Sequence, residues 1–176
     1  MPIRPRDPLL ISARLLLTLI MGLVVLLGAA VLAAVPLALI FKDRVMVSIA
    51  EHTTRVIGDD MIIAIMSILG LIVVMAALAF MFLREMRRIV DSVGEGNAFI
   101  PINSVRLARM GWITVGIEVI SIPAGAIGHW MAGMFRLATA DFGFSLGGIL
   151  LAVILFLLSR VFLEGAAMRE ELEGTV

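Results

Sequence analysis

Residues Leu15 to Phe41 read LLLTLIMGLVVLLGAAVLAAVPLALIF, a run of 27 residues without a charged side chain. A helix rises 1.5 Å per residue, so about 20 apolar residues cross the roughly 30 Å hydrocarbon core of a membrane. Further long apolar runs follow at Met61–Leu83, Gly111–Met131 and Phe142–Leu163. The sequence therefore predicts an all-α, polytopic membrane protein, a bundle of four transmembrane helices that forms a single domain over residues 1–176.

The composition supports this fold class. Hydrophobic residues make up 61% of the chain and charged residues 16%, whereas soluble domains are about half apolar and a quarter charged. A cleavable secretory signal is the alternative for the first run, but the apolar core of such a signal spans only roughly 7–15 residues. We therefore expect the first run to remain as a membrane span.

The basic residues predict how the spans are oriented. Ten of the 14 Lys and Arg residues fall in the N-terminal segment, in the connection 84–110 and around the C-terminal tail, whereas four fall on the other side. Because positively charged residues are enriched on the cytoplasmic side of membrane proteins, both termini and residues 84–110 are predicted to be cytoplasmic. An even number of spans is required for that topology, and the four apolar runs satisfy it.

The connection 84–110 is the most informative polar segment. Four apolar residues recur in it at helical spacing: Met86, Ile89, Val90 and Val93. The second span is therefore predicted to continue beyond the membrane as an amphipathic helix, with arginines on its wet face. Gly94, Gly96 and Pro101 predict a turn after it, and Asn103 is predicted to cap the helix that follows.

Several stretches of this chain resemble one known family. They are REMRRI at 84–89, GNAFIPIN at 96–103, RLARMGW at 106–112 and the ending FLEGAAMREELEGTV at 162–176. They are similar to the bacterial domain of unknown function 2975. The resemblance implies a four-span protein of the bacterial inner membrane, encoded beside a small helix-turn-helix regulator, and hence a membrane protein that holds or inhibits a transcription factor.

On this hypothesis the protein contacts the lipid bilayer and a regulator protein, and it binds no nucleic acid directly. The acidic tail and the basic end of the second helix enter the same compartment, so we expect them to pair and, with the apolar stripe, to form the docking surface. The candidate partner-binding residues are Arg84, Arg87, Arg88, Ile89, Val93, Glu170 and Glu171. Whether the protein forms a homo-oligomer stays open.

Glu118 supports a competing hypothesis, since it lies well inside the third apolar run. A carboxylate at membrane depth is costly and is a candidate site for protons or ions, which would make the protein a small transporter or ion sensor. The alternative is a packing role, with a hydrogen bond to a neighbouring helix through Ser67 or Ser121.

The sequence favours no other chemistry. His52 and His129 have no metal ligand at helical spacing, and the chain contains no cysteine. We find no serine–histidine–acid arrangement and no intramembrane aspartate pair. We therefore expect no catalytic residues, no metal site and no cofactor, and we do not expect an enzyme.

Overall fold

The computed structural model describes residues 8–41, 44, 59–135 and 145–174. Four long helices account for nearly all of this part of the chain: α1 (Pro8–Ile40), α3 (Asp59–Gly94), α4 (Pro101–Phe135) and α5 (Leu146–Gly174). Each is long and apolar enough to cross a membrane. The four predicted spans are thereby confirmed, although the predicted start of the last run, 142–144, lies outside the described residues.

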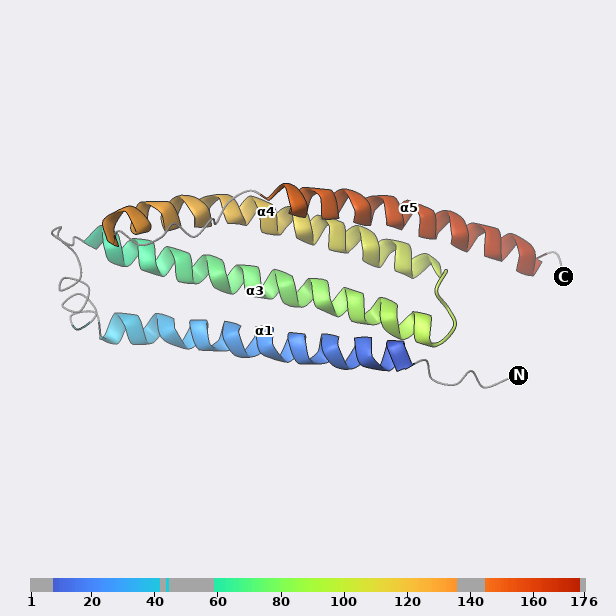
Figure 1. The fold of residues 1–176 in the computed structure, drawn as a ribbon, viewed down its shortest axis with the longest axis horizontal. Coiled ribbons are helices and arrows are strands. Elements are labelled where there is room, and N and C mark those ends of the chain that lie inside the picture. The colour runs from blue at the N-terminus through green and yellow to red at the C-terminus, as the bar shows by residue number, and fades with distance from the viewer. Residues whose placement is uncertain (1–7, 42–43, 45–58, 136–144, 175–176) are drawn as a thin grey trace.

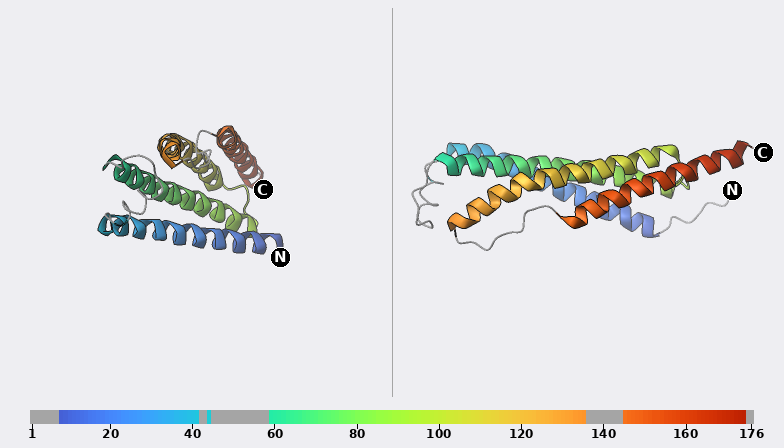
Figure 2. Two further views of the ribbon diagram at one scale, coloured as in Figure 1. Left: turned by 60° about the vertical axis from the view of Figure 1, so that its left-hand side comes forward. Right: turned by 90° about the horizontal axis from the view of Figure 1, so that it is seen from above.

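The helices lie side by side in chain order as an open layer (Figure 1). α1 packs on α3, α3 on α4, and α4 on α5, and within the described ranges no other pair of these helices brings Cα atoms within 8 Å of each other. The left view of Figure 2 shows the same order, with α1 and α5 at the two edges. The start of α1, the end of α5 and residues 95–100 between α3 and α4 lie at one end of the layer, which we call the turn end. The opposite end is the loop end.

α1 meets α3 along a narrow stripe of less exposed residues. These residues recur at alternating spacings of three and four and include Leu10, Leu17, Met21, Val24 and Gly28. Such spacing places side chains in one line along a helix. Gly28 lies opposite Ala76 of α3, and a Cβ at Gly28 would make an ordinary contact of 3.5 Å with the Ala76 side chain. The remaining surface of α1 is exposed and apolar, as expected for a helix that faces lipid.

The main hydrophobic core lies between α3, α4 and α5, towards the turn end. Its buried members are Leu107 and Met110 of α4 and Leu155 of α5. The side chains packed against them are Phe82, Met86, Ile89 and Phe162. At Gly111 an added Cβ would come within 2.8 Å of the Phe156 ring, so the absence of a side chain lets α5 approach α4 closely.

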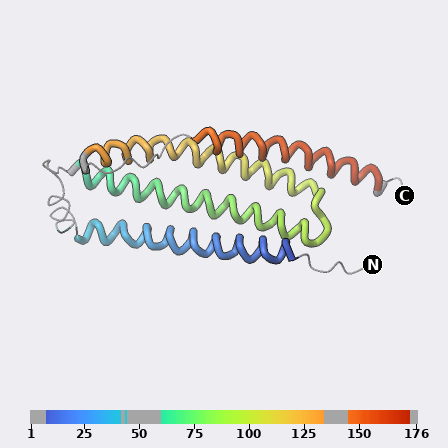
Figure 3. The backbone as a smooth tube through the Cα atoms, viewed as in Figure 1, coloured from blue at the N-terminus to red at the C-terminus, as the bar shows by residue number. Residues whose placement is uncertain are grey.

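α5 is displaced along α4 towards the turn end. It begins beside the middle of α4, because the backbone nitrogen of Ser145 lies 2.9 Å from the carboxylate of Glu118. Near its other end, Gly165 abuts the ring of Phe99 in the turn, where a Cβ would lie 2.7 Å from the ring. Figure 3 shows α5 continuing past the turn. The eight residues after Ala166 extend about 12 Å at 1.5 Å per residue.

Candidate functional site

A buried polar cluster joins α3 to α4 at the turn end. Its centre is Asn103, which is fully buried. The Asn103 amide donates hydrogen bonds to Ser92 Oγ at 2.7 Å and to the carbonyl of Ala98 at 2.9 Å. Its side-chain oxygen accepts a hydrogen bond from the Arg106 guanidinium at 2.9 Å. Because an amide offers two donors and one carbonyl acceptor, Asn103 is well satisfied in this buried position.

Arg106 and Ser159 extend the cluster to the neighbouring helices. The Arg106 guanidinium also donates to the carbonyl of Arg88 on α3 at 3.1 Å. From α5, the Ser159 hydroxyl donates to the carbonyl of Ser104 at 2.8 Å. Three helices are thus joined through side chain to backbone hydrogen bonds within a few turns. We infer that the cluster fixes the spacing of the helices where they leave the apolar region.

The predicted cap at Asn103 is wrong. α4 begins two residues earlier, at Pro101, and proline is favoured at a first helical position because its missing N–H would have no partner there. Asn103 lies in the first turn of α4, and its side chain points at α3 instead of capping its own helix.

The predicted arginines of α3 have three different surroundings. Arg84 is exposed. Arg87 is half-buried and lines a groove against α1. Arg88 pairs with Glu85 of its own helix at 2.9 Å, and Glu85 is 8% exposed. The second carboxylate oxygen of Glu85 is buried and has no hydrogen-bond partner among the described residues.

The apolar stripe of α3 lies mainly against α4. Met86 and Ile89 pack on the core of Leu107, Met110 and Leu155, and Val93 is half-buried. Ile89 therefore helps to hold α3 on α4. A substitution there would disturb the core as well as any partner contact.

The acidic tail residues lie on α5, on the far side of α4 from α3. Glu170 and Glu171 are exposed, in the part of α5 beyond the turn. Because α4 separates α5 from α3, and Arg88 pairs within its own helix, the structure does not bring the tail and the α3 arginines together as one surface.

Glu118 is positioned against the first turn of α5. Its carboxylate accepts a hydrogen bond from the Ser145 backbone N–H at 2.9 Å. It also lies so close to Gly148 that a Cβ there would clash with it. The N-terminus of a helix carries unpaired N–H groups and a partial positive charge, both of which favour a carboxylate. Ser121, expected as a partner, donates its hydroxyl to the Glu118 backbone carbonyl at 2.7 Å.

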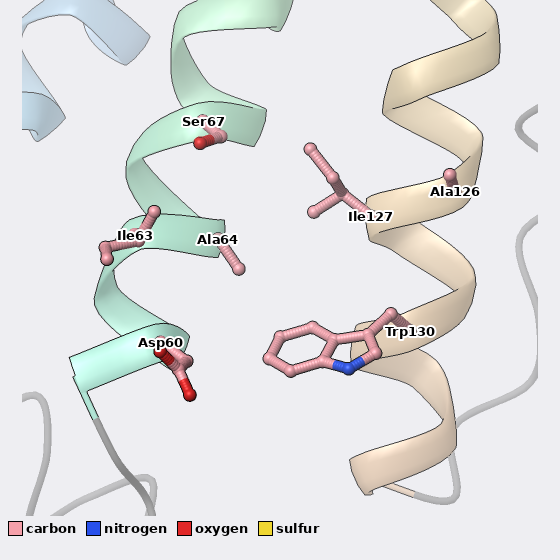
Figure 4. A pocket seen from close by; sticks show the side chains of 7 residues that line it. All are labelled: Asp60, Ile63, Ala64, Ser67, Ala126, Ile127 and Trp130. Atoms are coloured by element: carbon pink, nitrogen blue, oxygen red, sulfur yellow. The ribbon is translucent and has the colours of Figure 1, made fainter.

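An apolar groove of about 410 Å³ lies between α3 and α4 at the loop end. Figure 4 shows Ala64 of α3 facing Ile127 and Trp130 of α4, with Asp60 at the groove's mouth. Ser67, the other residue suggested as a partner for Glu118, also lines this groove. A small-molecule site usually combines an apolar lining with several convergent polar groups. The polar groups of this groove are one carboxylate, one hydroxyl and the indole N–H of Trp130.

In the described part of the chain, no group of three or more His, Cys, Asp or Glu side chains could hold a metal ion. His129 is exposed near the end of α4, and His52 lies outside the described residues.

No curated protein and no solved structure matches the chain. Residues 44–176 match the family described as Protein of unknown function (DUF2975). The match covers α3, α4 and α5 together with the polar cluster and the tail. The chain, a membrane-type protein of four apolar helices, therefore belongs to the DUF2975 family.

Proposed function

We propose that this protein is a regulator in the bacterial inner membrane, and that it holds a small helix-turn-helix transcription factor at the cytoplasmic surface. On this proposal the turn end of the layer is cytoplasmic, and so are both termini. The observation that supports it is the end of α5, which continues beyond the turn. A helix needed only to span the membrane would not require this extension.

The chemistry of the projecting segment suits a basic protein. Met168 and Leu172 are 60% and 71% exposed, and since they lie four residues apart they share one face of the helix. Glu171 and Arg169 lie on the two sides of that face, and Glu170 lies on the opposite side of the helix. DNA-binding proteins carry basic surfaces, so an acidic helix with an apolar stripe is electrostatically complementary to such a partner.

We assign the docking surface to the end of α5, with the buried polar cluster as its support. A partner that also reached α3 would meet Arg84 and Val93, which are at least partly accessible. Ile89 would act indirectly, because it packs in the core. Arg84, Arg87 and Arg88 keep the further role of fixing the orientation of α3 in the membrane.

The test is membrane retention of the partner. The protein is co-expressed with a small helix-turn-helix protein of the kind that the family resemblance implies beside its gene, and the membrane-bound fraction of that protein is measured. Replacing Met168 and Leu172 together with Ser should release the partner while the helices still insert. The matched control replaces Ile102 and Val105 with Ser; these are also exposed apolar residues, 45% and 43%, at the turn end but on α4.

Deleting residues 169–176 should release the partner as well, because it removes Glu170, Glu171 and Leu172 together. Retention of the partner after the deletion would place the docking surface elsewhere. If no such protein ever co-purifies with the intact chain, the proposed regulation is wrong.

Transport or ion sensing through Glu118 has weaker support. The carboxylate is engaged at the start of α5, and a packing role accounts for that geometry. Glu118→Gln distinguishes the two: loss of a pH- or ion-dependent output in a variant that still folds would favour transport, whereas an unchanged regulatory output would favour packing.

A further inference from the structure

A second groove lies between α1 and α3 at the turn end, with a volume of about 470 Å³. It is lined by Ile11, Arg14, Leu15 and Thr18 of α1 and by Arg87 of α3. Two guanidinium groups from different helices therefore share one groove. The charge-free run of α1 begins at Leu15, directly after Arg14, so the groove lies at the boundary between apolar and charged sequence.

The charges around this groove leave a net positive charge. Arg14 forms an ion pair with Asp91 of α3 at 2.6 Å through its Nε atom. One terminal nitrogen of Arg14, Nη2, lies against Gly94, where an added Cβ would be 3.2 Å from it. A guanidinium has five N–H donors, so Arg14 has donors left for another acceptor. Together, Arg14, Arg87 and Asp91 carry one positive charge.

We propose that this groove binds the phosphate of an anionic phospholipid. A phosphodiester carries one negative charge, and guanidinium groups bind phosphate oxygens through charge-assisted, often bidentate, hydrogen bonds. Basic pockets between membrane helices on the cytoplasmic side are suited to such headgroups.

The apolar walls select a lipid over a free anion. Ile11 and Leu15 are 52% and 64% exposed beside the two arginines. An acyl chain or glycerol backbone would cover these side chains, whereas inorganic phosphate would leave them uncovered. Arg87 holds the phosphate from α3 and Arg14 holds it from α1, so a bound lipid would also join the edge helix to the rest of the layer.

Native mass spectrometry of the full-length protein, released from detergent that contains equal amounts of phosphatidylglycerol and phosphatidylcholine, tests the proposal. Phosphatidylcholine has the same phosphate, but its own ammonium cancels the charge. We expect phosphatidylglycerol to be bound in about tenfold excess, because only its headgroup carries a net negative charge that the two arginines attract. Arg87→Gln should abolish this preference. Arg84→Gln, the same change three residues earlier at an exposed position outside the groove, should keep it.

A second matched pair tests the groove without removing an arginine. Ile11→Glu places a carboxylate in the wall and should abolish the preference, whereas Leu9→Glu changes the charge equally at a position that does not line the groove. Excess inorganic phosphate should leave the lipid bound. The proposal is overturned if wild type shows no preference, if the two members of either pair behave alike, or if phosphate displaces the lipid.

Discussion

Glu118 of α4 caps the start of α5: its carboxylate accepts a hydrogen bond of 2.9 Å from the backbone N–H of Ser145. This contact and the close approach at Gly148 set where α5 begins along α4. Because α5 is displaced along α4, its end lies beyond the turn. We propose that this end binds a partner. A residue that suggested ion transport by its depth thus contacts the start of a neighbouring helix.

Gly148→Ala should destabilise the protein by about 1–3 kcal/mol, because the new Cβ occupies the space of the Glu118 carboxylate. In a Glu118→Ala background that space is vacant, so the same change should cost close to nothing. The free energy of unfolding in mixed micelles, measured for all four combinations, gives the coupling between the two positions.

Gly147→Ala is the matched control for that cycle. A Cβ at Gly147 meets only the Ser145 hydroxyl, at 3.4 Å, so its effect should be the same with and without Glu118. Additive effects of Gly148→Ala and Glu118→Ala would show that the carboxylate is not packed against the first turn of α5.

Gly111→Ala should weaken the contact between α4 and α5. The Cβ would come within 2.8 Å of the Phe156 ring, and Phe156 also packs edge-on against Trp112, with ring centroids 5.4 Å apart. We expect a loss of about 1–3 kcal/mol and a change in Trp112 fluorescence. Gly70→Ala is the control, because nothing lies within 4 Å of a Cβ there; it should be neutral or slightly stabilising. Equal effects at both positions would contradict close packing at Gly111.

Asn103→Ala should cost about 2–4 kcal/mol, because it removes the hydrogen bonds with Ser92, Ala98 and Arg106 and leaves buried polar groups without partners. Asn97→Ala removes the same type of side chain from an exposed position in the same turn, and the hydrogen bond of its backbone N–H to Ser92 is kept. Thermal unfolding in detergent compares the two. An Asn103→Ala variant as stable as Asn97→Ala would mean that the cluster does not hold the turn.

The existence of the four helices was predictable because long apolar runs leave a chain few other structures in a membrane. The extension of α3 beyond its span followed from the spacing of Met86 and Ile89. The sequence did not predict which neighbouring helix this stripe faces. A helical pattern shows which residues share a face but not which neighbour covers that face. Ile89, predicted to meet a partner, packs on α4.

The contacts that fix the arrangement join residues far apart in the chain. Glu118 accepts a hydrogen bond from Ser145, which lies 27 residues later in the chain. Ser159 donates a hydrogen bond to Ser104, which lies 55 residues earlier. Neither partner is indicated by local propensity, and serine is common in any sequence. In the sequence, Arg14 is one of the basic residues that predict the orientation of the spans. Its ion pair with Asp91 requires α1 to lie beside α3, and only the tertiary structure shows that arrangement.

The proposed regulation requires the turn end to face the cytoplasm. The direct measurement fuses a reporter enzyme that is active only outside the cytoplasm at three points: after Glu51, after Gly96 and after Val176. The distribution of basic residues predicts activity after Glu51 and none at the other two points. Activity after Gly96 would place the polar cluster and the end of α5 outside the cytoplasm and would contradict the proposed regulation of a transcription factor.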